Sequence, residues 1–182
     1  GKVMLTYQAD KPEIKPIPDP AKAAKDPKDI ASIEQLFLTG LHLEQYRHAT
    51  YNPMDYYQEA LRREPGNVRC NNAIGLLLMR KGQFAAAEGY FRTATLTERN
   101  PNPYDGEPSY NLGWSCKMQG KADEAYDAFF KSAWNAAWQD AAYYGLAQID
   151  TAKGKYESAL DKVDRSLIRN WHNHKARQLK AS

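Results

Sequence analysis

The side chains of this sequence that could do chemistry are few, and their spacing argues against an active site. His172 and His174 form an H-x-H pair, but residues two apart on a helix point away from each other, so only an extended segment could bring both to a metal. Cys70 and Cys116 lack the paired spacing of a zinc or redox site and are predicted to be buried thiols. The sequence also contains no nucleophile elbow, phosphate loop or acid–base pair. We therefore expect no enzyme, no metal and no cofactor.

The composition of the chain limits the classes of partner that it could bind. The formal net charge is +3 over 182 residues, which is too mild for a surface that binds polyanions, so no nucleic acid is expected. No apolar run is long enough to span a membrane, and the N-terminus shows no signal peptide. A cytoplasmic location is predicted. Gly1 stands where a start methionine would be, which predicts an excised or processed piece of a longer chain.

The elements that must position any functional group follow from a repeat. Ala125 and Ala159 are 34 residues apart, as are Gly120 and Gly154, and Gly82 precedes Gly120 by 38 residues. Around them a small–aromatic–small pattern recurs as Ala87, Phe91 and Ala94 and as Ala125, Phe129 and Ser132, and a valine replaces the aromatic in Ala159, Val163 and Ser166. A period of this length indicates stacked helical hairpins, each unable to bury its apolar face alone. The periodic glycines are predicted to end the first helix of each hairpin in the left-handed conformation.

Apolar periodicity and capping residues predict nine helices and an all-α, right-handed solenoid with no sheet beyond short N-terminal pairing. We expect helices near residues 30–47, 53–64, 67–81, 83–99, 107–119, 121–135, 139–153 and 155–169, and a ninth from about 172. Gly75 and Gly113 fall inside two of these helices, where glycine is unfavourable unless another helix approaches closely.

These motifs resemble the tetratricopeptide repeat (TPR) family, whose first helix reads W-x2-L-G-x2-Y. Leu112-Gly113 and Ile74-Gly75 match that pattern, whereas Leu146-Ala147 departs from it and Gly40 lies one residue out of phase. The resemblance implies repeats at about 30–65, 67–100, 105–138 and 139–171, with 172–182 a truncated fifth repeat or a capping helix. The stretches TYQADKPEIKPIPDP and NAAWQDAAYYGLAQI further resemble the C-terminal TPR region of large bacterial proteins whose N-terminal domain has no known function.

Residues 1–28 differ in composition from the rest of the chain. The stretch KPEIKPIPDPAKAAKDPKD contains five prolines among alternating charges, which predicts an extended linker. It could be a flexible tether or a strap that lies along the solenoid. The apolar residues of VMLTY and EIKPI favour the strap.

In the TPR family the first helices line a concave groove, and the resemblance places eight residues of this chain there. These are Arg69, Asn72, Tyr110, Asn111, Trp114, Lys117, Met118 and Tyr144. Rigid aromatic anchors beside hydrogen-bond donors suit a peptide ligand, although Tyr110 and Trp114 could equally be packing between repeats. Of the family's carboxylate-clamp positions only Asn111 matches, which argues against an acidic-tail clamp.

The predicted function is therefore a protein-interaction scaffold. Its partner would be a protein or peptide, an upstream domain of the same polypeptide, or its own N-terminal segment, and the oligomeric state is left open. An alternative is an accessory domain that braces a bacterial carbohydrate-processing protein. In that case Trp138 or Trp171 would contact the sugar. Trp134 and Trp138 are four residues apart and expected on one helix face, where packing at the repeat junction is favoured over a platform for sugar rings. RNA binding is disfavoured by the near-neutral charge.

Overall fold

The computed structural model describes residues 2–9, 17, 19–20, 22–46, 49–96, 98 and 104–182. Over these residues the chain is helical and contains no strand, which confirms the predicted all-α class. The helices are α1 (Ile33–Gln45), α2 (Pro53–Arg63), α3 (Val68–Arg80), α4 (Phe84–Ala94), α5 (Glu107–Met118), α6 (Ala122–Ser132), α7 (Gln139–Ala152), α8 (Tyr156–Arg169) and α9 (His174–Ala181). Two short 3-10 helices, η1 (Pro27–Asp29) and η2 (Ala136–Trp138), precede α1 and α7.

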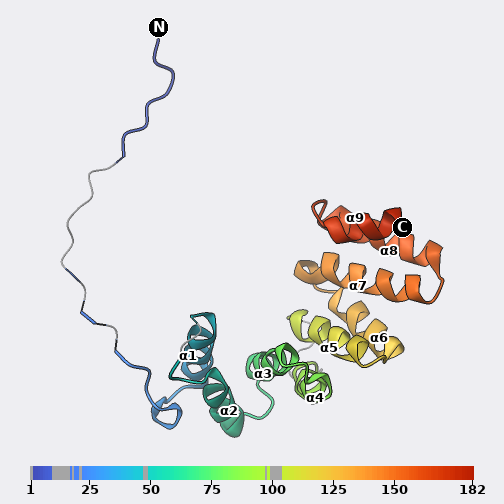
Figure 1. Ribbon diagram of the computed structural model, residues 1–182. Coiled ribbons are helices and arrows are strands. Elements are labelled where there is room, and N and C mark those ends of the chain that lie inside the picture. Colours follow the sequence, from blue (N-terminus) through green and yellow to red (C-terminus); the bar gives the residue numbers. More distant parts are fainter. Residues whose placement is uncertain are drawn as a thin grey trace.

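The helices stack as successive hairpins. Each of α1, α3, α5 and α7 packs against the helix that follows it, and α9 packs on α8. The stack curves so that α1, α3, α5 and α7 lie toward its inner side, while α2, α4 and α6 form the outer side (Figure 1). This is the arrangement of a helical-repeat superhelix, in which contacts are made mainly between neighbours in sequence.

Each hairpin from the second onward turns at a glycine. Gly82, Gly120 and Gly154 have φ values of 72°, 76° and 71°. An L-residue with a Cβ would be strained in this left-handed conformation, which glycine adopts freely. The period of these glycines therefore reports a real geometric requirement.

Inside three of the hairpins a glycine of the first helix lies against an aromatic ring of the second. A Cβ atom built on Gly75 would lie 2.4 Å from the ring of Phe91, and one on Gly113 would lie 2.6 Å from the ring of Phe129. Gly40 meets the ring of Tyr57 in the same way, at 2.6 Å, although it is out of phase in sequence. The two helices can approach this closely only because these positions lack a side chain.

The core is divided along the solenoid into three clusters of buried side chains. The first joins α1 and α2 to α3 and includes Cys70, the second runs from α4 to α7 and includes Cys116, and the third joins α7, α8 and α9. Both cysteines are free and fully buried, as predicted.

Two helices end at least three residues before the predicted position. The fourth helix ends at Ala94 instead of residue 99, and Thr95, which follows it, donates its hydroxyl hydrogen to the carbonyl of Arg92. The sixth ends at Ser132 instead of residue 135, where the Ser132 hydroxyl donates to the carbonyl of Gly106, 2.9 Å away. The Thr95 bond is a local bond of the kind that competes with the helical ladder, whereas the Ser132 bond ties the end of the sixth helix to the residue before α5.

Among the described residues of the N-terminal segment, those near its end dock on the first repeat. Ile30 is buried, the hydroxyl of Tyr56 donates to the carbonyl of Lys25 at 2.9 Å, and Arg63 donates to the carbonyl of Ile30 at 2.6 Å. By contrast, the apolar side chains of VMLTY are at least 75% exposed, so the burial expected of them is not seen. Of EIKPI only Ile17 lies within the described residues, and it too is exposed.

Candidate functional site

The inner side of the solenoid carries a hollow of about 240 Å³ between α1, α3 and the start of α5. Its apolar wall includes Phe37, Leu41 and Leu76, and its polar groups include Glu44 and Glu107. A concave site with apolar walls and a few charged groups is the usual form of a ligand-binding site.

Arg69, one of the predicted groove residues, lines this hollow and lies across its apolar wall. Its guanidinium carbon is 3.9 Å from the centroid of the Phe37 ring, a cation–π contact. Its Nη1 is 2.7 Å from an oxygen of Glu34. The first helices of the first two hairpins, α1 and α3, therefore hold Arg69 on the inner face.

Asn72 and Asn111, also predicted groove residues, are buried and bonded to each other. The Nδ2 of Asn111 donates to the Oδ1 of Asn72 at 2.9 Å, which links the second repeat to the third. Beside them, burial raises the pKa of the Glu107 carboxyl, although hydrogen bonds from Asn72 and Asn111 oppose that rise. The two amides thus hold the repeats together and orient a carboxylate at the edge of the hollow.

Farther along the inner face the aromatic residues form a packed group. The ring of Tyr110 lies 6.3 Å from that of Trp114, 5.6 Å from that of Phe129 and 5.0 Å from that of Trp138. Tyr110 and Trp114 remain half-buried, so one part of each ring packs while another part faces the inner side. Burial raises the pKa of the Tyr110 hydroxyl.

A polar chain extends this group to the fourth repeat. The Nζ of Lys117 lies 4.6 Å from the centroid of the Trp114 ring and donates to the Oε1 of Gln148 at 2.6 Å. The Nε2 of Gln148 in turn donates to the Tyr144 hydroxyl at 2.9 Å. Because Lys117 is partly removed from water, its pKa is lowered.

The eight predicted groove residues therefore form two groups. Arg69 and Asn72 line the hollow, and Asn111 is bonded to Asn72. The other five lie along α5 and α7, and of these Met118 is 53% exposed. Several serve inter-repeat packing and the inner surface together, which are the two interpretations that the sequence left open.

The alternative of a sugar platform formed by Trp134 and Trp138 on one helix face is wrong, whereas the favoured interpretation, packing at the junction of two repeats, holds for Trp138. The sixth helix ends at Ser132, and Asn135 caps η2 by accepting a hydrogen bond from the backbone N–H of Ala137. Trp138 consequently turns inward against Tyr110, while Trp134 stays 62% exposed. An early helix end, which spacing alone does not show, separates the two rings.

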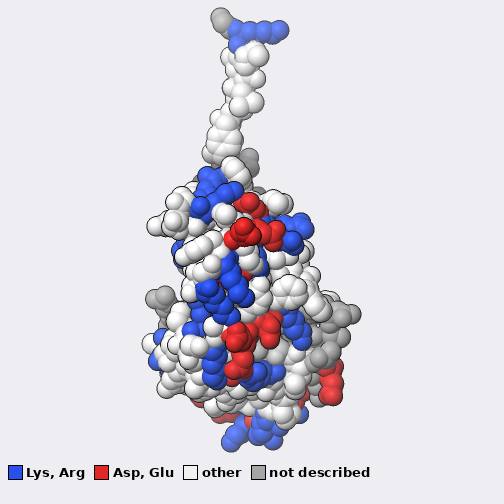
Figure 2. Space-filling view, turned by 90° about the vertical axis from the view of Figure 1, so that its right-hand side faces the viewer, with Lys and Arg blue, Asp and Glu red and all other residues white. Residues whose placement is uncertain are grey.

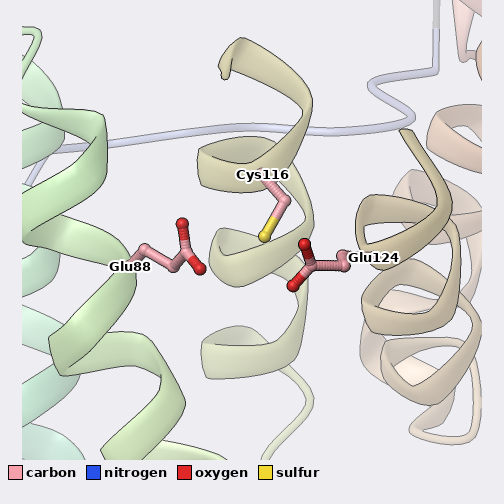
Figure 3. Close-up of side chains that lie close together, drawn as sticks. All are labelled: Glu88, Cys116 and Glu124. Atoms are coloured by element: carbon pink, nitrogen blue, oxygen red, sulfur yellow. The ribbon is translucent and has the colours of Figure 1, made fainter. Parts of the chain in front are cut away.

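Glu88, Cys116 and Glu124 come together from α4, α5 and α6, with ligand atoms within 4.8 Å of one another (Figure 3). The two carboxylates already have cationic partners. Arg92 pairs with both, and Lys121 lies 2.7 Å from Glu88. Burial raises the pKa of the Cys116 thiol, which disfavours the thiolate that binds metals. These residues fit an ion-pair network better than a metal site.

The face shown in Figure 2 carries Lys and Arg interspersed with Asp and Glu. This mixture matches the small formal net charge of +3. In the described part of the chain, no helix combines the length and the apolar character needed to cross a membrane.

Sequence reasoning missed a group of aromatic residues on the outer side. Tyr126, Phe130 and Tyr143 line a crevice together with Trp134. Phe130 follows directly after Phe129, and the only signal was that two adjacent aromatics cannot both face the core of one helix.

Comparison with known proteins places this architecture. No family model matches the sequence. Among solved structures, a crystal structure of MamA superposes with a TM-score of 0.69 at 18% identity, covering 81% of this chain and 78% of that one. PilF of Pseudomonas aeruginosa superposes with a TM-score of 0.70 at 16% identity, over 82% of this chain and 66% of that chain.

The structure of YrrB, described as a TPR protein with an unusual peptide-binding site, is also similar. It superposes with a TM-score of 0.65 at 22% identity and covers 82% of this chain and 73% of that chain. Likeness at this level of identity shows a shared fold. The fold of this chain is that of TPR proteins, as the motifs indicated.

Proposed function

We propose that this chain, which has the TPR fold, is a protein-interaction scaffold that binds an extended segment of protein along the inner side of its helical array. The observation that carries the proposal is the hollow between α1 and α3, where Phe37, Leu41 and Leu76 form an apolar wall beside Arg69 and Glu107. Half-buried aromatic rings of α5 continue the same side. Anchors of this kind surrounded by polar groups are typical of protein-recognition surfaces.

The ligand could be a separate protein, a neighbouring domain or the N-terminal segment of this chain. The exposed apolar side chains of Val3, Met4, Leu5 and Tyr7 supply material for the last of these. A tethered segment would act at a high local concentration, so even weak contacts could hold it on the inner side. Residues 24–30 would remain docked on the first repeat, as the bonds of Tyr56 and Arg63 support.

The proposal is tested with a display library of random peptides, panned against the full chain and against a truncation that lacks residues 1–20. We expect selected peptides to bind the full chain, to lose affinity in a Leu41→Arg variant and to bind the truncation more tightly if the N-terminal segment competes. Leu41 lines the hollow and is only half-buried, so an arginine there fills the hollow at little cost to the core.

Ile168→Arg is the matched control, because Ile168 lies on α8 and is 80% exposed. It adds the same side chain far from the hollow. Thermal melts check that both variants are folded. Peptides that bind both variants equally well would show that the inner hollow is not the binding surface, and the proposal would be wrong.

A further inference from the structure

A second concave site lies on the outer side of the solenoid, where α6 and α8 flank the start of α7. It is a crevice of about 490 Å³, within the range of sites that hold small ligands. Aromatic side chains from α6 and α7 and from the turn between them line it, among them Tyr126, Phe130, Trp134 and Tyr143. None of these four contributes to the inner hollow.

Two of these rings are exposed to solvent, at positions where the repeat pattern would predict polar side chains. Phe130 and Trp134 are 51% and 62% exposed. The residue 38 positions before Phe130 is Arg92, and the residue 34 positions after it is Asp164, so the equivalent sites in adjacent repeats are charged. Only the third repeat puts an aromatic ring at this position. Exposed aromatic rings gathered at a crevice mark a binding surface more often than isolated exposed residues do.

The crevice also contains a buried acceptor. Gln139, the first residue of α7, lines it, and the Oε1 of Gln139 is buried without a hydrogen bond from the residues that the structure describes. A buried polar atom without a partner is costly, and the large majority of such atoms have one. A rotation of the Gln139 side chain that turns this oxygen toward the crevice would let an O–H or N–H of a ligand donate to it and remove that cost.

The charged groups of the crevice are paired with each other or with neighbours. Lys162 is held by Asp150 at 2.8 Å and lies 5.6 Å from the centroid of the Tyr126 ring. Arg165 is held by Asp161 at 2.9 Å. Neither cation is left to bind an anion, and two cations at the wall disfavour a cationic ligand. The crevice therefore suits a neutral ligand, to which Asp161 and Arg165 still offer an acceptor and a donor at the rim.

From these features we propose that the crevice binds a sugar residue. One face of the sugar ring, which consists of C–H groups, would stack on Phe130 and Trp134, because aromatic rings offer large flat apolar surfaces. A hydroxyl of the same ring would donate a hydrogen bond to the Oε1 of Gln139. Other hydroxyls would bond with Asp161 and Arg165. A sugar is the neutral ligand that combines an apolar face with several donors and acceptors at its edge.

The test uses the full chain and a panel of free methyl glycosides and disaccharides, with binding detected by saturation-transfer NMR and quantified by titration. We expect at least one sugar to bind, and Trp134→Ala and Gln139→Leu each to weaken it by about tenfold or more. Trp171→Ala is the matched control, since Trp171 is 67% exposed but lies against Arg177 near α9. Because Trp134 is exposed, its removal leaves the fold intact, which a thermal melt confirms.

The site is separated from the inner hollow by the Leu41→Arg variant, which should bind the sugar as the unmodified chain does. The proposal fails if no sugar in the panel binds, or if binding is unchanged by both Trp134→Ala and Gln139→Leu. It also fails if these two variants instead lose the peptides selected on the full chain, because the crevice would then be a peptide surface.

Discussion

Two neighbouring junctions of the solenoid are built on the same frame but have opposite outer sides. Between the second and third repeats, Glu88 of α4 is bonded by Arg92, Lys121 and Gln119, which closes the surface with charge. Between the third and fourth repeats, the residues 38 positions later are Tyr126 and Phe130, and the surface opens into an aromatic crevice. An ion pair spaced i, i+4 has become an aromatic pair at the same spacing.

The two hairpins that carry these outer faces do not differ in this way. Both rest on a phenylalanine of the second helix that packs under a glycine of the first, Phe91 with Gly75 and Phe129 with Gly113. The repeat thus separates two tasks. The glycine–phenylalanine contact fixes the hairpin, and the outer face of the second helix is free to vary because it does not determine the hairpin's geometry.

The largest effect should come from the shared core. Phe91→Ala and Phe129→Ala should each lower the free energy of unfolding by about 3–5 kcal/mol, because each removes a fully buried ring. Phe130→Ala, one residue away and 51% exposed, is the control and should cost far less. Chemical denaturation measures all three. Similar midpoints for Phe129→Ala and Phe130→Ala would show that the assigned hairpin core is wrong.

Acid should act on the charged junction more than on the aromatic one. Burial opposes ionisation of Glu88, but hydrogen bonds from Lys121, Arg92 and Gln119 outweigh it and lower its pKa to about 2. A folded pKa below the unfolded value of about 4.3 gives stability that is complete above that value and is lost as the pH falls toward 2. The loss should be about 3 kcal/mol at most.

Urea denaturation of the unmodified chain and of Glu88→Gln, measured between pH 7 and pH 2, tests this expectation. The free energy of unfolding of Glu88→Gln should fall less steeply below pH 4.5, because the residue that titrates there is gone. Parallel curves for the two proteins would mean that Glu88 does not supply the acid sensitivity.

A smaller effect is expected from filling the glycine position of the third repeat. Gly113→Ala should cost about 1–3 kcal/mol, since its Cβ would meet the ring of Phe129. The fourth repeat shows the compatible solution, with Ala147 and Val163 at the equivalent positions of one buried cluster. The double variant Gly113→Ala/Phe129→Val should therefore lose less than the sum of its single variants. Strict additivity in a double-mutant cycle would argue against direct contact.

The smallest effect on stability, about 1 kcal/mol or less, should come from exchanging one residue of the outer sides. Phe130→Arg gives the third repeat the residue that the second repeat has at this position, and because Phe130 is 51% exposed its removal takes little packing from the core. The free energy of unfolding should barely change, whereas any sugar binding in the crevice should disappear. Retained sugar binding in this variant would contradict the proposal that the sugar ring stacks on Phe130.

The sequence was sufficient for the fold because the fold is periodic. Seven of the nine helices begin within one residue of the predicted position and the ninth begins two residues after it, and the turn glycines fall where their period puts them. The first helix is the exception and begins at Ile33, because the side chain of Ser32 caps it by accepting from the backbone N–H of Gln35. Period and capping chemistry are local, and local signals can be read from one sequence.

The candidate sites were harder to predict, because they depend on where helices end and on which residues satisfy each other. The hydrogen bond between Asn72 and Asn111 joins two adjacent repeats, and the sequence of neither helix predicts it. Trp134 and Trp138 were placed on one face because the spacing of four was assumed to be helical, whereas α6 ends before them. Position in a repeat predicts which side of the array a residue occupies, but its partners are a tertiary property.

The two buried thiols can report how often parts of the solenoid open. Cys70 and Cys116 belong to different core clusters, and burial raises the pKa of each, that of Cys70 to about 12. A thiol reagent can reach either sulfur only when its part of the array opens. The labelling rate of Cys70 therefore reports opening of the first cluster, and that of Cys116 reports opening of the second. Substituting one cysteine leaves a single reactive thiol, so the labelling rate of the other can be measured alone. Local opening of these two parts of the array can thus be measured without introducing a probe.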